Sequence, residues 1–150
     1  MLAELEALYR ARLPEFRRVA AALAGDAEAG RDAVQEAFAV AVRKRRSYRG
    51  EAPLEAWVWR IVVNTAHNQR RRRSEPLPAD YDPARNGSEP PALPLELLTP
   101  RQREVLFLRY YADLDYASIA AALGISPGTV GATLTAARET LRRALQEVEA

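Results

Sequence analysis

The sequence of 150 residues contains no cysteine and only one histidine, His67. The chain can therefore form no disulfide framework and no thiolate metal site, and we expect neither a metal nor a cofactor. Apolar runs stay well short of the roughly 20 residues that span a membrane, and the N-terminus does not resemble a signal peptide. We therefore expect a cytoplasmic protein without membrane insertion. The sequence offers no nucleophile–base set and no phosphate-binding loop, so we expect no enzymatic activity.

Lysine is also scarce, because Lys44 is the only one and the other basic residues are arginines. The formal net charge of +2 conceals an uneven distribution along the chain. Residues 1–73 carry +6, residues 74–94 carry −3 and residues 95–150 carry −1. A positive field over the first half would attract a polyanion.

Residues 74–94 (SEPLPADYDPARNGSEPPALP) interrupt the apolar periodicity and contain six of the ten prolines. An acidic, proline-rich segment buries too little apolar surface to fold alone, so it predicts a flexible linker. As a free coil it would span about 25 Å on average, and about 70 Å when fully stretched. The sequence thus predicts an all-α fold with two small helical domains, residues 1–73 and 95–150.

Apolar periodicity predicts three helices in the first domain, over residues 2–24, 29–46 and 54–73. Pro14 is expected to kink or break the first helix, and residues 47–53 form a loop. Trp57 is assigned to the core rather than to a stacking platform, whereas Trp59 is the tryptophan that could be exposed. The expected inward side chains are Leu5, Leu8, Phe16, Val19, Ala20 and Leu23; Val34, Ala37, Phe38, Ala41 and Val42; and Leu54, Trp57, Val58, Ile61 and Thr65.

The stretch 98–130 (LTPRQREVLFLRYYADLDYASIAAALGISPGTV) predicts two helices, a short loop and then a helix-turn-helix. Gly124 can take the left-handed conformation that ends a helix. Ser126 can cap the next helix, and Pro127 fits its first position. A motif of this kind commonly presents a helix to the DNA major groove, and a helical hairpin that only packs is the alternative.

The order of these segments resembles a bacterial RNA polymerase sigma factor of the extracytoplasmic-function group. The resemblance runs from GDAEAGRDAVQEAF through SYRGEAPLEAWVWRIVVNTAHNQRRRR and the proline-rich segment to the helix-turn-helix. It implies sigma domain 2 in residues 1–73, a linker in 74–94 and sigma domain 4 in 95–150. Members of the group bind the β and β′ subunits of core RNA polymerase, direct it to promoter DNA and help to melt it. Many are held inactive by an anti-sigma factor, so we expect such a partner.

The resemblance places the polymerase contact on the second helix. Asp32, Val34, Gln35, Glu36 and Phe38 match the segment with which the family clamps the β′ subunit. Asp32, Gln35 and Glu36 can line a polar face suited to a basic partner, while Val34 and Phe38 pack elsewhere. A helix face that is only solvated is the alternative.

Recognition of the promoter −10 element is assigned to the loop and the third helix. Residues 48–53 match a loop that captures a flipped base, where an aromatic ring, an arginine and backbone amides can stack and hydrogen-bond. The arginines that end the helix would bind phosphates, or would only favour the helix C-terminus electrostatically. His67 is expected at the surface, and Asn68 stands where many members have Asp. The candidates are Tyr48, Arg49, Gly50, Glu51, Arg60, Asn64, His67, Asn68, Arg70, Arg71, Arg72 and Arg73.

The helix that would read the −35 element departs most from the family pattern, which is T-V-K-S-R-L followed by further basic residues. Here Gly131, Thr133 and Ala136 occupy the basic positions. The loss of three cations predicts a contact that is weak, apolar or replaced. A sigma-like adaptor whose fourth domain binds a regulatory protein is the alternative. The −35 candidates are Arg101, Ser126, Gly128, Thr129, Gly131, Thr133 and Arg138.

Overall fold

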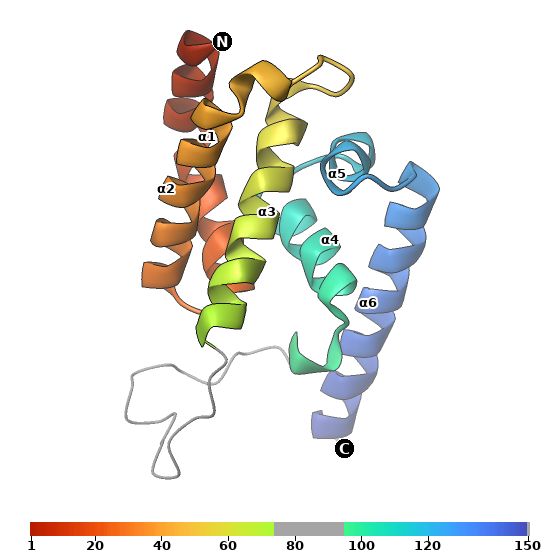
Figure 1. The fold of residues 1–150 in the computed structure, drawn as a ribbon. Helices are drawn as coiled ribbons and strands as arrows, with labels where there is room; N and C mark the ends of the chain where they lie inside the picture. Colours follow the sequence, from red (N-terminus) through yellow and green to blue (C-terminus); the bar gives the residue numbers. More distant parts are fainter. Residues whose placement is uncertain (74–94, 150) are drawn as a thin grey trace.

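The computed structural model describes residues 1–73 and 95–149, and the regular secondary structure within these ranges is helical (Figure 1). The expected all-α fold is confirmed. The segment expected to be a linker, residues 74–94, lies outside the described residues, as does the side chain of Arg73.

The first half folds as α1 (Leu2–Ala24), α2 (Ala27–Arg43) and α3 (Leu54–Arg73), with a short 3-10 helix at Arg45–Ser47. Pro14 does not break α1, because the helix continues through it while apolar residues on both sides of the proline pack inward. Such packing outweighs the roughly 3 kcal/mol that an interior proline costs a helix. The expectation of a break at Pro14 was wrong.

Helices α1 and α2 approach each other closely at Gly30, which is buried. A Cβ atom on Gly30 would lie only 2.5 Å from the backbone nitrogen of Ala21 in α1. Val34, Ala37 and Ala41 continue the buried stripe of α2 at helical spacing. Val42 was expected to face inward but is 38% exposed, because in the last turn of α2 Ala41 takes the buried side.

The second half contains a 3-10 helix at Leu95–Leu97, then α4 (Pro100–Tyr110), α5 (Tyr116–Leu123) and α6 (Pro127–Glu149). Between Leu98 and the loop there is thus one helix, where two were expected. Thr99 and Pro100 set the start of α4, since Thr99 and Gln102 cap each other's backbone N–H groups at 3.2 and 3.0 Å.

The helix-turn-helix between α5 and α6 has the expected turn. Gly124 is left-handed, with φ +70°, and its N–H donates to Ala120 O at 2.8 Å. Ser126 Oγ accepts from the N–H of Thr129 at 3.1 Å, and α6 begins at Pro127. These three local predictions are confirmed.

Helix α5 also has a side-chain cap at its N-terminus. Asp115 Oδ1 accepts a 2.7 Å hydrogen bond from the N–H of Ser118. The hydrogen bonds from Ser118 hold the pKa of the Asp115 carboxyl below its ordinary value, because they stabilise the ionised form.

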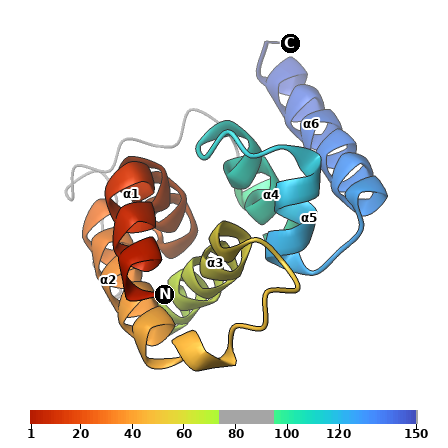
Figure 2. The same cartoon turned by 90° about the horizontal axis from the view of Figure 1, so that it is seen from above.

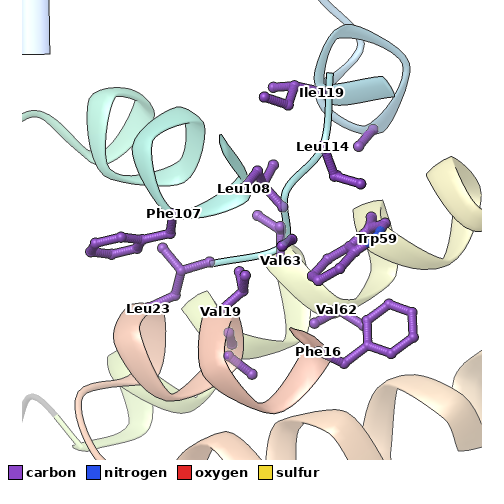
Figure 3. Close-up of a cluster of buried hydrophobic side chains, with 14 of the residues drawn as sticks. Phe16, Val19, Leu23, Trp59, Val62, Val63, Phe107, Leu108, Leu114 and Ile119 are labelled. Atoms are coloured by element: carbon purple, nitrogen blue, oxygen red, sulfur yellow. The ribbon is translucent and has the colours of Figure 1, made fainter. Parts of the chain in front are cut away.

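Helix α3 is covered by both halves of the molecule, with α1 and α2 on one side and α5 on the other (Figures 1 and 2). Phe16, Trp59 and Val63 from the first half therefore share a core with Leu108 and Leu114 from the second (Figure 3). Trp59, the tryptophan that could have been exposed, belongs to this core.

Trp59 is completely buried, whereas Trp57 is partly exposed. The pattern of apolar residues was interpreted as a single buried stripe along the helix. Because α3 is covered on two sides, that interpretation gave Trp57 a more buried position than Trp59, the reverse of what is found.

Considered singly, none of the helices in the described ranges is long and apolar enough to cross a membrane. Tyr116–Leu123 and Pro127–Glu147 pass that test only together, as a pair bent by 101°.

Candidate nucleic-acid interface

The polar face of α2 presents Asp32 and Gln35 to solvent. Val34 is 1% exposed, and the Phe38 ring makes edge contacts with the rings of Tyr9 and Phe16, at 5.0 and 5.3 Å between centroids. Val34 thus holds α2 in place, and Phe38 packs against the core while remaining partly exposed.

Glu36, the third polar residue of this face, is linked to α3. Its Oε2 accepts a 3.1 Å hydrogen bond from Gln69 Nε2, and its Oε1 lies 3.8 Å from Arg72 Nη2. Glu36 therefore connects the acidic face of α2 with the arginine-rich end of α3, while Asp32 and Gln35 form the more accessible part of that face.

The loop before α3 is held by Tyr48, which is half-buried. The Tyr48 hydroxyl donates to Ala52 O, and its ring lies 5.3 Å from the Trp57 ring at a tilt of 46°. Arg49, Gly50 and Glu51 are exposed at the tip. Tyr48 thus supports the loop, and the chemistry it offers outward is the Arg49 guanidinium with the backbone of a turn in which Gly50 has φ +76°.

A hollow of about 340 Å³ lies between α2 and α3. Its wall includes the partly exposed Trp57 indole together with Lys44, Asn64 and Asn68. An aromatic face beside amide groups and a cation suits an unstacked base. Trp57 packs against the core, as expected, and also lines this hollow. The hollow was not predicted, and the spacing of Trp57 seven and eleven residues before Asn64 and Asn68 was the available signal.

The opposite side of α3 is engaged with the second half of the chain. Arg60 Nε and Nη2 donate to Ala122 O and Ala121 O, each at 3.2 Å. Both carbonyls belong to the last turn of α5, directly before the turn of the helix-turn-helix. Arg60 therefore satisfies backbone acceptors at a helix C-terminus, where a cation is favoured.

His67 makes a second contact between the halves. Its Nε2 lies 2.6 Å from Glu104 Oε1 on α4, and Glu104 Oε2 accepts from Arg101 Nη1 at 3.0 Å. We expected His67 to be a plain surface side chain, but it is only 26% exposed and has a carboxylate partner. The structure thus brings together one −10 candidate, His67, and one −35 candidate, Arg101, on a single carboxylate.

The last turn of α3 presents Arg70, Arg71 and Arg72 at the surface. Nearby, Arg103 Nε donates to Leu95 O at 2.9 Å. Partial burial, and then the charge of Arg70, lower the pKa of Arg103. Cations thus crowd around the end of α3, a setting that favours the approach of phosphate.

The N-terminal turns of α6 expose Ser126, Gly128 and Thr129, and Thr133 is half-buried. A Cβ on Gly131 would lie 3.4 Å from Cε2 of the Tyr116 ring. This end of α6 therefore offers hydroxyl groups and close backbone approach in place of cations.

Arg138 lies farther along α6 and has an aromatic partner. Its Nε donates to the Tyr110 hydroxyl at 2.8 Å, and its guanidinium carbon lies 5.5 Å from the Tyr110 ring centre. Both residues line an apolar groove of about 500 Å³ between α4 and α6, which sequence reasoning did not identify. The other lining residues are Leu95, Leu106, Phe107, Tyr111, Leu141, Arg142 and Leu145.

Family profiles match both halves of the chain: sigma-70 region 2 over residues 8–75 and sigma-70 region 4 over residues 95–141. The chain is 31% identical to an RNA polymerase sigma-E factor of Streptomyces coelicolor, with 95% of this chain and 86% of that protein covered. It is 32% identical to an ECF RNA polymerase sigma-E factor of Escherichia coli, covering 77% and 73% of the two chains.

Two solved structures share the fold. The sigma factor RpoE of Bartonella quintana, in complex with the anti-sigma factor NepR, is 26% identical with a TM-score of 0.70. That comparison covers 95% of this chain and 97% of the other. CnrH, in complex with the cytosolic domain of CnrY, is 22% identical with a TM-score of 0.72, and it covers 98% and 90% of the two chains.

Proposed function

Because the chain belongs to the ECF group of the sigma-70 family of RNA polymerase sigma factors, we propose that it binds core RNA polymerase and directs it to specific promoters. In this role it acts in the cytoplasm and catalyses no reaction of its own. The face of α2 contacts the polymerase, the first half binds the −10 element and the second half binds the −35 element.

The observation that carries this proposal is the surface of the first half. An exposed acidic and amide face on α2 lies beside a hollow lined by Trp57, Lys44 and Asn64, and an arginine-rich helix end follows. A basic polymerase segment fits the acidic face, while an unstacked base and its phosphates fit the hollow and the arginines. The +6 charge of residues 1–73 places the main attraction for DNA in this half.

The second half is suited to a different kind of DNA contact from the first, one that depends on close approach rather than on cations. With Gly131 and Thr133 where the family carries cations, α6 can approach a groove floor closely but gains little from phosphates. We therefore assign it the smaller share of the DNA affinity. The adaptor alternative is not favoured, because the similar RpoE of Bartonella quintana is itself a sigma factor, bound to the anti-sigma factor NepR. An anti-sigma factor is accordingly the expected regulatory partner of this chain.

Run-off transcription with purified core polymerase on fragments of the source genome tests this function. We expect discrete transcripts that need the chain and disappear with Asp32→Arg. Glu147→Arg makes the same charge change at an exposed position on α6 and should leave the transcripts intact. The absence of any chain-dependent transcript on the whole genomic set would contradict the proposal.

A further inference from the structure

We propose that the second half recognises thymine methyl groups in the −35 element, through the ring of Tyr116 on α5 and the methyl group of Thr135 on α6. The inference rests on the proposed function of α6 and names the base chemistry that it reads. Neither residue was among the expected −35 contacts. The start of α6, residues 127–135, carries no charged side chain, so it cannot read guanine as an arginine or a lysine would.

Gly131 is the position around which these two side chains meet. A Cβ on Gly131 would lie 3.4 Å from Cε2 of the Tyr116 ring, so the ring lies beside the bare backbone of α6. Tyr116 is nevertheless 40% exposed. One helical turn farther on, Thr135 Oγ1 donates to Gly131 O at 2.9 Å. The aromatic ring and the threonine thus occupy neighbouring places on one side of α6.

The groups that these two residues offer to a base are apolar. Thr135 is exposed, and because its hydroxyl is hydrogen-bonded back to the helix, its γ-methyl is the group that it presents outward. Tyr116 directly follows Asp115, whose carboxylate accepts a 2.7 Å hydrogen bond from the N–H of Ser118. That carboxylate repels phosphate from the Tyr116 hydroxyl, which leaves the ring as the contacting group.

An apolar surface of this kind favours thymine, because thymine presents its C5-methyl group in the major groove. Burial of one methyl group corresponds to roughly a fourfold gain in affinity. Two such contacts therefore supply base preference with only a modest gain in total affinity, in agreement with the smaller share assigned to the second half. Since an apolar contact releases no counterions, this preference should not depend on salt.

Deoxyuridine substitution tests the proposal directly, because deoxyuridine pairs like thymidine but lacks the methyl group. The probe is a fluorescein-labelled duplex of a promoter mapped by run-off transcription, bound by core polymerase together with the chain. Replacement of single thymidines in the −35 element should weaken binding about fourfold at one or two positions. Each penalty should be the same at about 50 mM and about 200 mM salt. Replacement of thymidines in the spacer is the control and should leave binding unchanged.

Substitutions in the chain remove the protein side of each contact. Thr135→Ser keeps the hydroxyl that bonds Gly131 but loses the methyl group, and Tyr116→Ala removes the ring. In each variant one deoxyuridine penalty should disappear, because the deleted thymine methyl has already lost its partner. Tyr116→Phe keeps the ring and should keep its penalty. Thr140→Ser is the matched control, because Thr140 Oγ1 likewise donates to Ala136 O, at 3.1 Å, but lies beyond the N-terminal turns that enter the groove.

Several outcomes would overturn the proposal. The first is a mapped −35 element without thymine in either strand, and the second is the absence of any deoxyuridine penalty within that element. The third is a set of penalties that persist in both Thr135→Ser and Tyr116→Ala, which would show that the methyl groups act through DNA shape. In all three cases the unmodified chain still directs run-off transcription, so the proposed function stands. Loss of every chain-dependent transcript would instead contradict that function.

Discussion

Replacing Gly30 by alanine should destabilise the protein, although the same change usually stabilises a helix. In an open helix interior, alanine is favoured over glycine by about 1 kcal/mol. At Gly30 the added Cβ would lie 2.5 Å from the nitrogen, 2.6 Å from the Cα and 2.9 Å from the Cβ of Ala21. Two of these atoms are backbone and cannot rotate away, so α1 and α2 must move apart.

The size of the effect follows from these opposing contributions. Overpacking of a tight contact costs about 1–3 kcal/mol, against the gain of about 1 kcal/mol in helix propensity. Separation of α1 from α2 also loosens the packing of Val19 and Ala20, which are completely buried. We expect a net loss of about 1–2 kcal/mol in the free energy of unfolding. In a chain of this size such a loss lowers Tm by several degrees.

Urea unfolding followed by far-ultraviolet circular dichroism measures this loss. Gly128→Ala is the matched control, because Gly128 also lies in a helix and the nearest atom to its added Cβ is Ser126 Oγ at 3.9 Å. That variant should be as stable as the unmodified chain or gain up to about 1 kcal/mol. If Gly30→Ala gained stability like Gly128→Ala, the close approach of α1 and α2 would be refuted.

Three further predictions concern the interfaces. Asp32→Arg should weaken binding to core polymerase at least 100-fold, since repulsion replaces a charge match worth several kcal/mol. The circular dichroism spectrum should be retained, and undiminished co-purification with core enzyme would contradict the prediction. The isolated fragment 95–150 should bind duplex DNA weakly and with a shallow salt dependence, because its net charge is close to neutral. Tight binding at physiological salt would show that α6 carries more affinity than we assign. The double change Gly131→Lys and Thr133→Arg should tighten DNA binding and steepen its salt slope by roughly 0.9 per phosphate contact. Loss of promoter activity without any gain in affinity would show instead that the small side chains are needed for close approach.

The elements whose signals lie within a few residues were predictable from the sequence. The left-handed turn at Gly124, the cap at Ser126 and the helix start at Pro127 all stand where their local chemistry placed them. The number of helices before the loop was misjudged even so, because α4 is the one helix there and two were expected. Local patterns therefore predicted most of the helices and the turn between α5 and α6, but not the single helix before the loop.

The candidate site was predicted as a set of residues but not as an arrangement. Charge and family resemblance selected Arg60, His67 and Arg101, and nothing in the sequence indicated that a carboxylate on α4 joins two of them. Trp57 packs against the core as expected, but the hollow that it also lines between α2 and α3 was not predicted. Helical spacing relates Trp57 to Asn64, but it does not say which faces of α3 remain open.

The sequence by itself determined the helices, the turn of the helix-turn-helix and the excess of positive charge in the first half, because each depends on neighbouring residues or on composition. Only the tertiary structure decided that Trp59 is buried, that Gly30 fits against Ala21 and that Arg60 reaches carbonyls 61 and 62 positions away. These contacts depend on how whole helices cross, and α3 is covered on two sides by segments from both halves. Apolar periodicity along one helix records that a face is buried but carries no information about which distant segment buries it.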